Sequence, residues 1–164
     1  MRLVISDTGP INYLVLIGHI GVLPILFEKV VMPVAVLDEL ADLDAPPSVR
    51  AWIADPPFWI EVREAPAFSD DDLLASLDDG ERAAITLAAA HRAELLLLMD
   101  DREGVLVARQ KGLAVTGTIG VLDMAAQRGL LHLAEAFARL RNTSFRCPEE
   151  IMTSLLDAKK RQGQ

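Results

Sequence analysis

The sequence predicts an α/β protein, a three-layer α/β/α sandwich with a central parallel sheet. Short apolar runs that are typical of buried strands alternate along the chain with segments of helical spacing. The chain has 164 residues, of which 51% are hydrophobic, which suits one core but not two. We therefore expect a single domain over residues 1–164, in which residues 132–164 form a C-terminal helical extension that covers the core or a partner surface.

The N-terminal half contains three predicted strands separated by helices. Apolar, β-branched runs suit strands buried on both faces, whereas alternation suits a half-exposed strand. Proline is favourable at the first position of a helix, so Pro33 predicts the start of one. The expected elements are a strand at 2–6, a helix at 8–19, a strand near 29–32, a helix at 34–43, a short helix at 48–55 and a half-exposed strand at 58–65.

The C-terminal half repeats the alternation and then becomes helical. Glycines that follow the helical patterns, such as Gly112, indicate where helices end. The expected elements are a helix at 81–93, a strand at 94–99, a helix at 101–112, a strand at 113–117, a helix at 118–129 and two further helices separated by Pro148. The proline-rich stretches near 45–48 and 55–57 are interpreted as loops within the domain.

Charge and composition exclude several classes of protein. A net charge of -8 argues against a chain that holds nucleic acid by its overall electrostatics, so a phosphate-bearing substrate has to meet local cations. No window approaches the roughly 18 apolar residues of a membrane span, and the N-terminus lacks a secretory pattern, so we expect a cytoplasmic protein with no membrane partner. The single Cys147 agrees, since it has no partner for an internal disulfide.

Two predicted strands end in acids. Asp7 follows the first strand, and Asp100 and Asp101 follow the strand at 94–99. In an open parallel sheet, the functional crevice lies beyond the carboxyl ends of the strands. Helix capping explains each acid equally well when it is taken alone, because a helix follows in both places.

Two more acids favour a cluster over simple capping. Glu39 lies within an otherwise apolar helical run, and Glu81 opens the Ala-rich helix, although an acid there also suits the helix dipole. Gathered carboxylates repel one another, so a hard cation such as Mg²⁺ or Mn²⁺ would stabilise them. Zinc is poorly supported, because the three histidines lack the spacing of zinc ligands. The sequence also has no phosphate-binding loop of the P-loop type and no pattern that supports a nucleophile triad.

Five segments together resemble the PIN-domain family, and in particular a prokaryotic PIN-like group with a paired "DD" and a "GT-GVL" segment. In chain order they are "VISDTGPINYL", "VLDEL", "LDDGERAAITLA", "LLLMDDREGVLVA" and "VTGTIGVL", over about residues 3 to 130. The resemblance implies an α/β/α sandwich and a Mg²⁺- or Mn²⁺-dependent endoribonuclease that cleaves single-stranded RNA, often the toxin of a toxin–antitoxin pair. An antitoxin protein and a second copy of the chain, in a homodimer, are the partners we expect beside RNA.

The resemblance also implies the residues of the site. The four acids of the family fall on Asp7, Glu39, Glu81 and Asp101, as both catalytic residues and metal ligands. Asp100 is a close competitor of Asp101 for the metal, and the family's spacing to Ala108 favours Asp101. The predicted substrate contacts are Thr8, Thr116, Thr118 and Arg102; Thr8 is equally an ordinary first-turn residue, and a structural role is favoured for Thr116 and Thr118.

Two departures and two alternatives remain. Met99 stands where the family often has a small polar residue, and the cation that often follows "GVL" is absent unless Arg128 replaces it. Arg109 and Lys111 join Arg102 as candidate RNA contacts, although a solvated helix face explains them as well. The alternative function is a catalytically silent PIN-like module that binds nucleic acid or protein. A phosphoacceptor receiver-like domain is more distant, since the first strand ends in one acid and no lysine follows the last strand.

Overall fold

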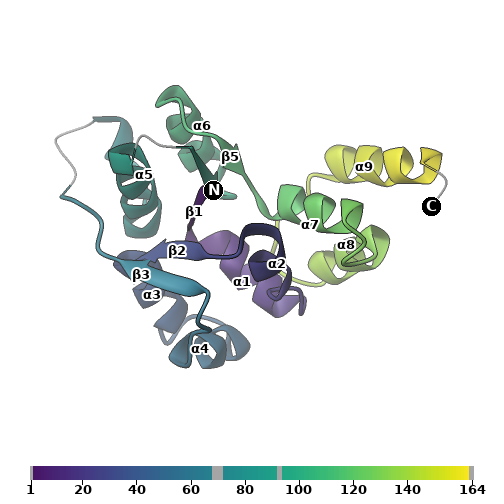
Figure 1. Ribbon diagram of the computed structural model, residues 1–164, viewed down its shortest axis with the longest axis horizontal. Helices are drawn as coiled ribbons and strands as arrows, with labels where there is room; N and C mark the ends of the chain where they lie inside the picture. The colour runs from purple at the N-terminus through teal and green to yellow at the C-terminus, as the bar shows by residue number, and fades with distance from the viewer. Residues whose placement is uncertain (1, 68–71, 92–93, 163–164) are drawn as a thin grey trace.

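The computed structural model contains a five-stranded parallel sheet flanked by helices on both faces, as predicted (Figure 1). It describes residues 2–67, 72–91 and 94–162. The strand order is β3-β2-β1-β4-β5, so β1 lies at the centre. The strands are β1 (Leu3–Ser6), β2 (Val30–Pro33), β3 (Ile60–Arg63), β4 (Leu95–Leu98) and β5 (Val115–Thr116).

Helices form the outer layers of the sandwich. In the N-terminal half these are α1 (Thr8–Leu16), α2 (Val22–Phe27), α3 (Val34–Ala41) and α4 (Pro47–Ala54). The C-terminal half supplies α5 (Asp79–His91), α6 (Arg102–Gln110), α7 (Thr118–Gln127), α8 (Leu133–Arg141) and α9 (Glu149–Arg161), with a 3-10 turn η1 (Asp72–Leu74) before α5. None of the helices within the described residues is both long enough and apolar enough to cross a membrane.

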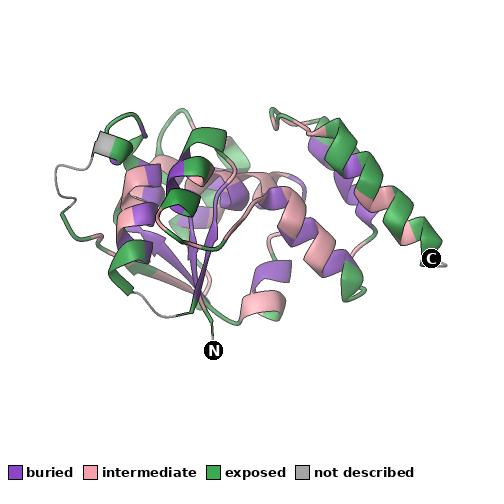
Figure 2. Cartoon of the chain, turned by 90° about the horizontal axis from the view of Figure 1, so that it is seen from above, coloured by how far each residue is buried: buried purple, intermediate pink, exposed green. Residues whose placement is uncertain are grey.

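Successive strand residues face opposite sides of the sheet, which gives two cores. Val4 and Leu96 belong to the larger core, whereas Ile5 and Leu97, one residue further along each strand, belong to the smaller one. Residues of α1, α3, α4, α7 and α8 fill the larger core, and residues of α5 and α6 fill the smaller one. In Figure 2 the buried colour accordingly follows the strands and the inner sides of the helices.

The predicted C-terminal pair of helices is present, and part of it packs on the larger core. Phe137 and Leu140 of α8 are fully buried there, as is Met152 of α9. Phe145 is half-buried and makes an edge-to-face contact with Tyr13 of α1. Ile151, on the other hand, is 57% exposed.

Two local predictions differ from the structure. Helix α2 was not predicted, because "VLPILF" is a short apolar run around Pro24 without the periodicity of an amphipathic helix. Pro33 was expected to open a helix, but it is the last residue of β2 and the N-cap of α3, which begins at Val34. Its fixed φ of -64° suits either place, so the dihedral of proline does not decide between them.

Candidate metal centre

The carboxyl ends of the central strands bring the predicted acids to one edge. Asp7 directly follows β1, and its backbone N–H donates to the carbonyl oxygen of Leu98 in β4 at 2.9 Å. Four residues pair in register between β1 and β4, from Leu3 with Leu95 to Ser6 with Leu98. The acids that follow Leu98 therefore emerge beside Asp7.

Asp7 is the most constrained of these acids. Asp7 is 6% exposed, and its buried Oδ1 has no hydrogen-bond partner within the described part of the chain. Burial raises the pKa of Asp7 to about 7; a hydrogen bond from the Thr8 backbone opposes this shift, and the charges of Asp78, Glu39 and Asp100 add to it. Asp7 therefore has an oxygen atom that is ready to coordinate a cation, and its ionised form is costly without one.

Glu39 reaches the same place from α3. Both of its carboxylate oxygens are held, since Thr8 Oγ1 donates to Oε2 and the Gly80 backbone N–H donates to Oε1 at 3.0 Å. Burial raises the pKa of Glu39, despite these two hydrogen bonds. Its neighbour Asp38 is exposed, so the structure separates a half-buried acid from a solvated one at adjacent positions.

Asp78, which the sequence analysis did not predict, completes a group of three carboxylates with Asp7 and Glu39. Asp7, Glu39 and Asp78 each offer a carboxylate oxygen, and the three oxygens lie within 4.8 Å of one another. Asp78 immediately precedes α5 and accepts the backbone N–H of Glu81 at 2.8 Å. A capping position three residues before Glu81 was the available signal, but such positions are common at helix starts.

Glu81 forms a hydrogen bond with the Asp78 carboxyl group and is not one of the group of three. It is buried, and burial is the largest cause that raises its pKa, followed by a hydrogen bond to the Asp78 carboxyl group and by the charges of Asp78, Asp101 and Asp7. The protonated form of Glu81 relieves its repulsion with Asp78 when no cation is present.

The paired acids Asp100 and Asp101 occupy different sides of the site. Asp100 accepts both the backbone N–H of Thr118 at 2.7 Å and its hydroxyl at 2.6 Å, and its charge raises the pKa of Asp7. Asp101 is the N-cap of α6; it accepts the Gly104 N–H at 3.0 Å, and its charge acts on Glu81. Asp100 thus links β4 to α7 beside Asp7, whereas Asp101 is exposed beside Glu81.

The predicted substrate residues also differ from one another in their surroundings. Thr8 and Thr118 donate to acids, Thr116 packs its hydroxyl over Gly120, and Arg102 is exposed at the start of α6. Arg128 lies at the opposite end of α7 from Thr118, and its guanidinium donates to the carbonyl oxygen of Ile25. Arg128 therefore does not supply the cation that is missing after the "GVL" segment.

Four glycines make room for the carboxylates, because they have no Cβ atom. A Cβ atom at Gly80 would lie 2.7 Å from both Glu39 oxygens, and one at Gly117 would lie 2.5 Å from Asp100 Oδ1. A Cβ atom at Gly9 would lie 3.1 Å from Asp100 Oδ2, and one at Gly104 would lie 3.3 Å from Glu81 Oε2. These glycines are at the starts of α1, α5, α6 and α7, so four helix N-termini border the acids.

A hard divalent cation fits this donor set. The group consists of carboxylate oxygens alone, which are the ligands that Mg²⁺ and Mn²⁺ prefer. The charged groups that act most on Asp7, Glu39 and Glu81 are other carboxylates, so the described side chains do not neutralise the cluster. A cation bound to the unpartnered oxygen of Asp7 would remove this repulsion.

Comparison with protein families identifies the family of the chain. A family model described as PIN domain covers residues 3–161 of the chain. No curated protein matches, and no solved structure does.

Proposed function

The chain belongs to the PIN-domain family, whose members are generally metal-dependent nucleases, and from this premise we propose that it is an endoribonuclease that uses Mg²⁺ or Mn²⁺ to cleave single-stranded RNA. One observation carries the proposal: carboxylate oxygens of Asp7 after β1, Glu39 in α3 and Asp78 before α5 lie within 4.8 Å of one another, and Asp7 Oδ1 has no hydrogen-bond partner in the described chain. Nothing in a stable fold requires this arrangement, because it costs desolvation and repulsion.

Asp7, Glu39 and Asp78 are the residues that would hold the cation. When bound, a divalent cation supplies an activated water and offsets the negative charge that develops on the phosphate. Thr8 and the Gly80 backbone fix the orientation of Glu39, so this ligand is in place before binding. Asp100 and Asp101 add negative charge on the two sides of the group and strengthen its attraction for a cation.

The substrate is met by local groups, because the chain as a whole carries a net charge of -8. Arg102 and Arg109 are exposed along α6, which begins directly after Asp101, and they are the proposed contacts for the RNA backbone. Thr118 is fully buried and donates to Asp100, and Thr116 lies over Gly120, which supports a structural role for both.

The test is cleavage of a labelled single-stranded RNA by the full chain with Mg²⁺ or Mn²⁺, with EDTA, and with the Asp7→Asn and Asp101→Asn proteins. We expect activity only with metal, loss in Asp7→Asn and a reduced rate in Asp101→Asn. Asp157→Asn, an exposed acid of α9, is the matched control and should cut at the wild-type rate. Cleavage that persists in EDTA or in both variants contradicts the proposal, and metal binding without cleavage indicates the silent module instead.

A role as the toxin of a toxin–antitoxin pair is the finer part of the proposal. It predicts that expression of the chain arrests growth, and that co-expression of a neighbouring reading frame relieves the arrest. The Asp7→Asn protein should not arrest growth at equal abundance. An Asp7→Asn protein that is equally toxic would contradict a toxin that acts by cleavage.

A further inference from the structure

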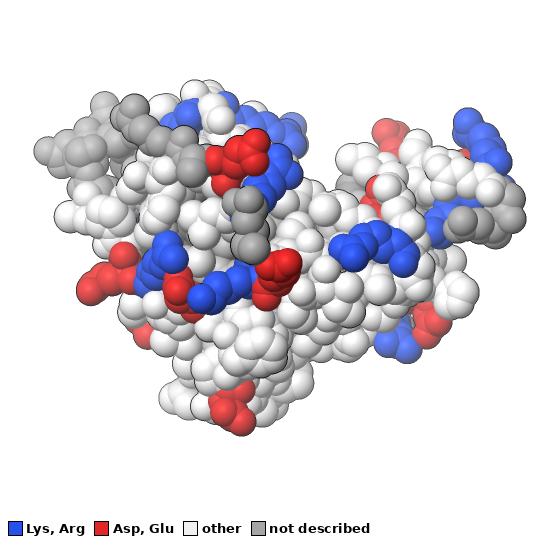
Figure 3. All heavy atoms as spheres, in the orientation of Figure 1, with Lys and Arg blue, Asp and Glu red and all other residues white. Residues whose placement is uncertain are grey.

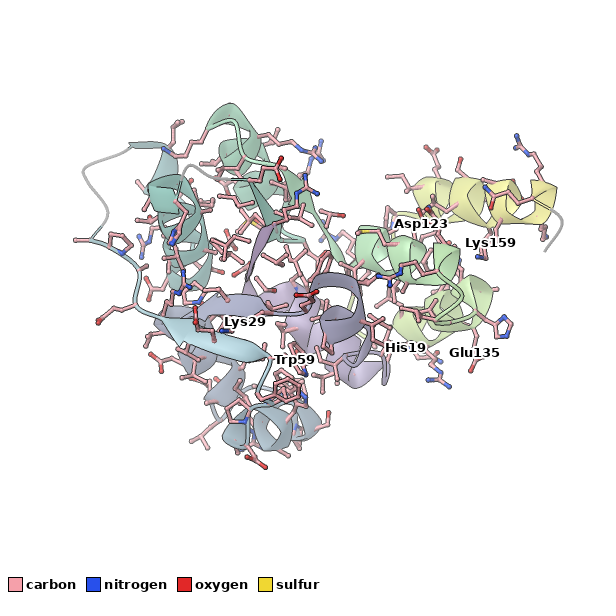
Figure 4. The ribbon with its side chains drawn as sticks, viewed as in Figure 1. His19, Lys29, Trp59, Asp123, Glu135 and Lys159 are labelled. Atoms are coloured by element: carbon pink, nitrogen blue, oxygen red, sulfur yellow. The ribbon has the colours of Figure 1, made fainter. Side chains whose placement is uncertain are left out.

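A basic pocket lies on the opposite edge of the sheet from the candidate metal centre. It is a cavity of about 160 Å³ near the amino ends of β1 and β2. Its lining residues are Arg2, Leu3, Val4, Phe27, Lys29, Val31 and Arg63. Lys29 is labelled in Figure 4, where it lies between the ribbons of β2 and β3.

Hydrogen bonds organise the cations at the rim of this pocket. Glu61 of β3 accepts from Lys29 Nζ at 3.3 Å and forms an ion pair with the Arg63 guanidinium. Arg63 Nη1 also contacts His91 Nε2 at 3.1 Å, and His91 Nδ1 is 2.9 Å from the carbonyl oxygen of Leu87. These contacts hold Lys29 and Arg63 in place, so the two side chains lose less entropy when a ligand binds.

The residues that line the pocket include three cations and no acid, although the chain as a whole carries a net charge of -8. Arg2 is exposed and is the third of these cations, and Glu61 pairs with the other two. Arg2 and Lys29 precede β1 and β2, whereas Arg63 is the last residue of β3, so the three cations come from three neighbouring strand segments. In Figure 3 basic and acidic side chains alternate in a row over β3 and β2 on this face.

The floor of the pocket is apolar and small. Leu3, Val4, Phe27 and Val31 supply it, and Val4 and Val31 are themselves buried. Sites for drug-sized ligands are about 300–1,000 Å³, so this cavity has room for about one side chain. An apolar side chain would fill the floor, while carboxylates on either side of it would meet the spread cations.

We propose that this pocket docks an acidic peptide segment of a partner protein, with one apolar side chain in the cavity and flanking carboxylates on Arg2, Lys29 and Arg63. Nucleic acid fits less well, because the floor is small and mainly aliphatic. A strand of RNA on this edge would also lie across the sheet from Asp7. A peptide bound here leaves the carboxyl edge open, so the pocket is a site for a protein partner and does not depend on cleavage.

The test measures binding of fluorescein-labelled heptapeptides to the full chain by fluorescence anisotropy. The probe peptide has a central Leu between Glu residues. In one comparison peptide Ser replaces the central Leu, and in the other Lys replaces every Glu. We expect the Ser peptide to bind roughly tenfold more weakly, since the buried Leu is lost, and the Lys peptide not to bind. Added NaCl should weaken binding of the Glu–Leu peptide, because its charge pairs with the protein are exposed to solvent.

Variants locate the binding site. Arg2→Glu should lower affinity for the Glu–Leu peptide about fivefold or more, and Arg2→Glu with Arg63→Glu should lower it further. Lys160→Glu, an equal charge change at an exposed position of α9, should leave the affinity unchanged. Thermal melting checks the fold of each protein, and Arg2→Glu alone decides the result if the double variant does not fold, because Arg2 is exposed.

Three results would overturn the proposal. The first is no saturable binding of the Glu–Leu peptide, and the second is equal binding to Arg2→Glu and wild type. The third is displacement of the peptide by a ten-nucleotide single-stranded RNA whose own binding is lost in Arg2→Glu, which would assign the pocket to nucleic acid. None of these results depends on cleavage, so Asp7→Asn protein can be used throughout.

Discussion

At the scale of single residues, Asp7 determines how the site behaves without metal. A carboxyl group with a pKa of about 7, against an ordinary value of 3.8, binds its proton more tightly in the folded chain than in the unfolded chain. The folded state is therefore favoured by this group at low pH, and the contribution disappears as the pH rises from about 4 to 7. Each pKa unit corresponds to about 1.4 kcal/mol, so the effect reaches a few kcal/mol.

Replacement of Asp7 by Asn should therefore stabilise the metal-free protein at neutral pH. We expect a higher melting temperature for Asp7→Asn than for wild type at pH 7.5 in EDTA, and a smaller difference at pH 4, where the acid is protonated. Mg²⁺ or Mn²⁺ should raise the melting temperature of wild type only. Thermal melting across this pH range is the measurement, and an Asp7→Asn protein that is less stable at pH 7.5 would show that Asp7 serves the fold.

Adjacent acids on α3 give a second test at this scale. Glu39 is half-buried and held by Thr8 and Gly80, whereas Asp38 is exposed. Glu39→Gln should abolish stabilisation by Mn²⁺ and reduce RNA cleavage by about 100-fold or more, because a ligand is lost. Asp38→Asn should retain both properties within twofold, and equal losses in the two proteins would indicate a general charge effect.

Residue types predicted part of this site. Asp7, Glu39 and Glu81 stand out because they interrupt apolar runs or open helices, and the structure brings all three to one edge. Asp78 was missed, since the acid-rich stretch "LDDGE" offers several equivalent carboxylates. Its selection depends on how α5 packs against α3, which is a contact between segments about 40 residues apart.

At the scale of elements, helices begin where the acids lie, and glycine makes room for them. A glycine within a helix usually costs about 0.5–1 kcal/mol relative to alanine. Gly80 is retained in the first turn of α5, where its N–H binds Glu39 and a Cβ atom would displace that carboxylate. The same reasoning applies to Gly117 at the start of α7, beside Asp100.

Gly80→Ala should therefore weaken metal binding without a gain in stability. We expect the affinity for Mn²⁺ to fall by roughly tenfold, since Glu39 has to move. Gly21→Ala is the matched control, because no atom lies within 4 Å of its Cβ position and its φ of -66° is ordinary. Isothermal titration with Mn²⁺ measures both proteins, and unchanged affinity in Gly80→Ala would show that Glu39 tolerates displacement.

At the scale of the whole molecule, the parallel sheet separates two edges of opposite character. All five strands run the same way, so their carboxyl ends gather the acids, while their amino ends leave Arg2 and Lys29 on the other side. The C-terminal helices lie beyond α7 in Figure 1, away from both edges. They contribute to the larger core through α8 and through Met152 of α9.

The contribution of α9 to the core can be measured with two neighbouring residues. Met152→Ala should lower the free energy of unfolding by about 2–5 kcal/mol, because Met152 is fully buried. Ile151→Ala, at an exposed position, should change it by no more than about 0.5 kcal/mol. Urea unfolding gives both values, and equal small effects would show that α9 serves a partner surface rather than the core.

The sequence by itself determined the alternation of strands and helices, the parallel sheet and the presence of acids after β1 and β4. Those features are local: apolar runs, helical spacing, and glycine and proline at the ends of elements are readable within a few residues. The tertiary structure decided the strand order, the convergence of Asp78 with Asp7 and Glu39, and the separate partners of Asp100 and Asp101. These depend on which faces pack together and in what register, and such long-range contacts leave no periodic signal in the chain.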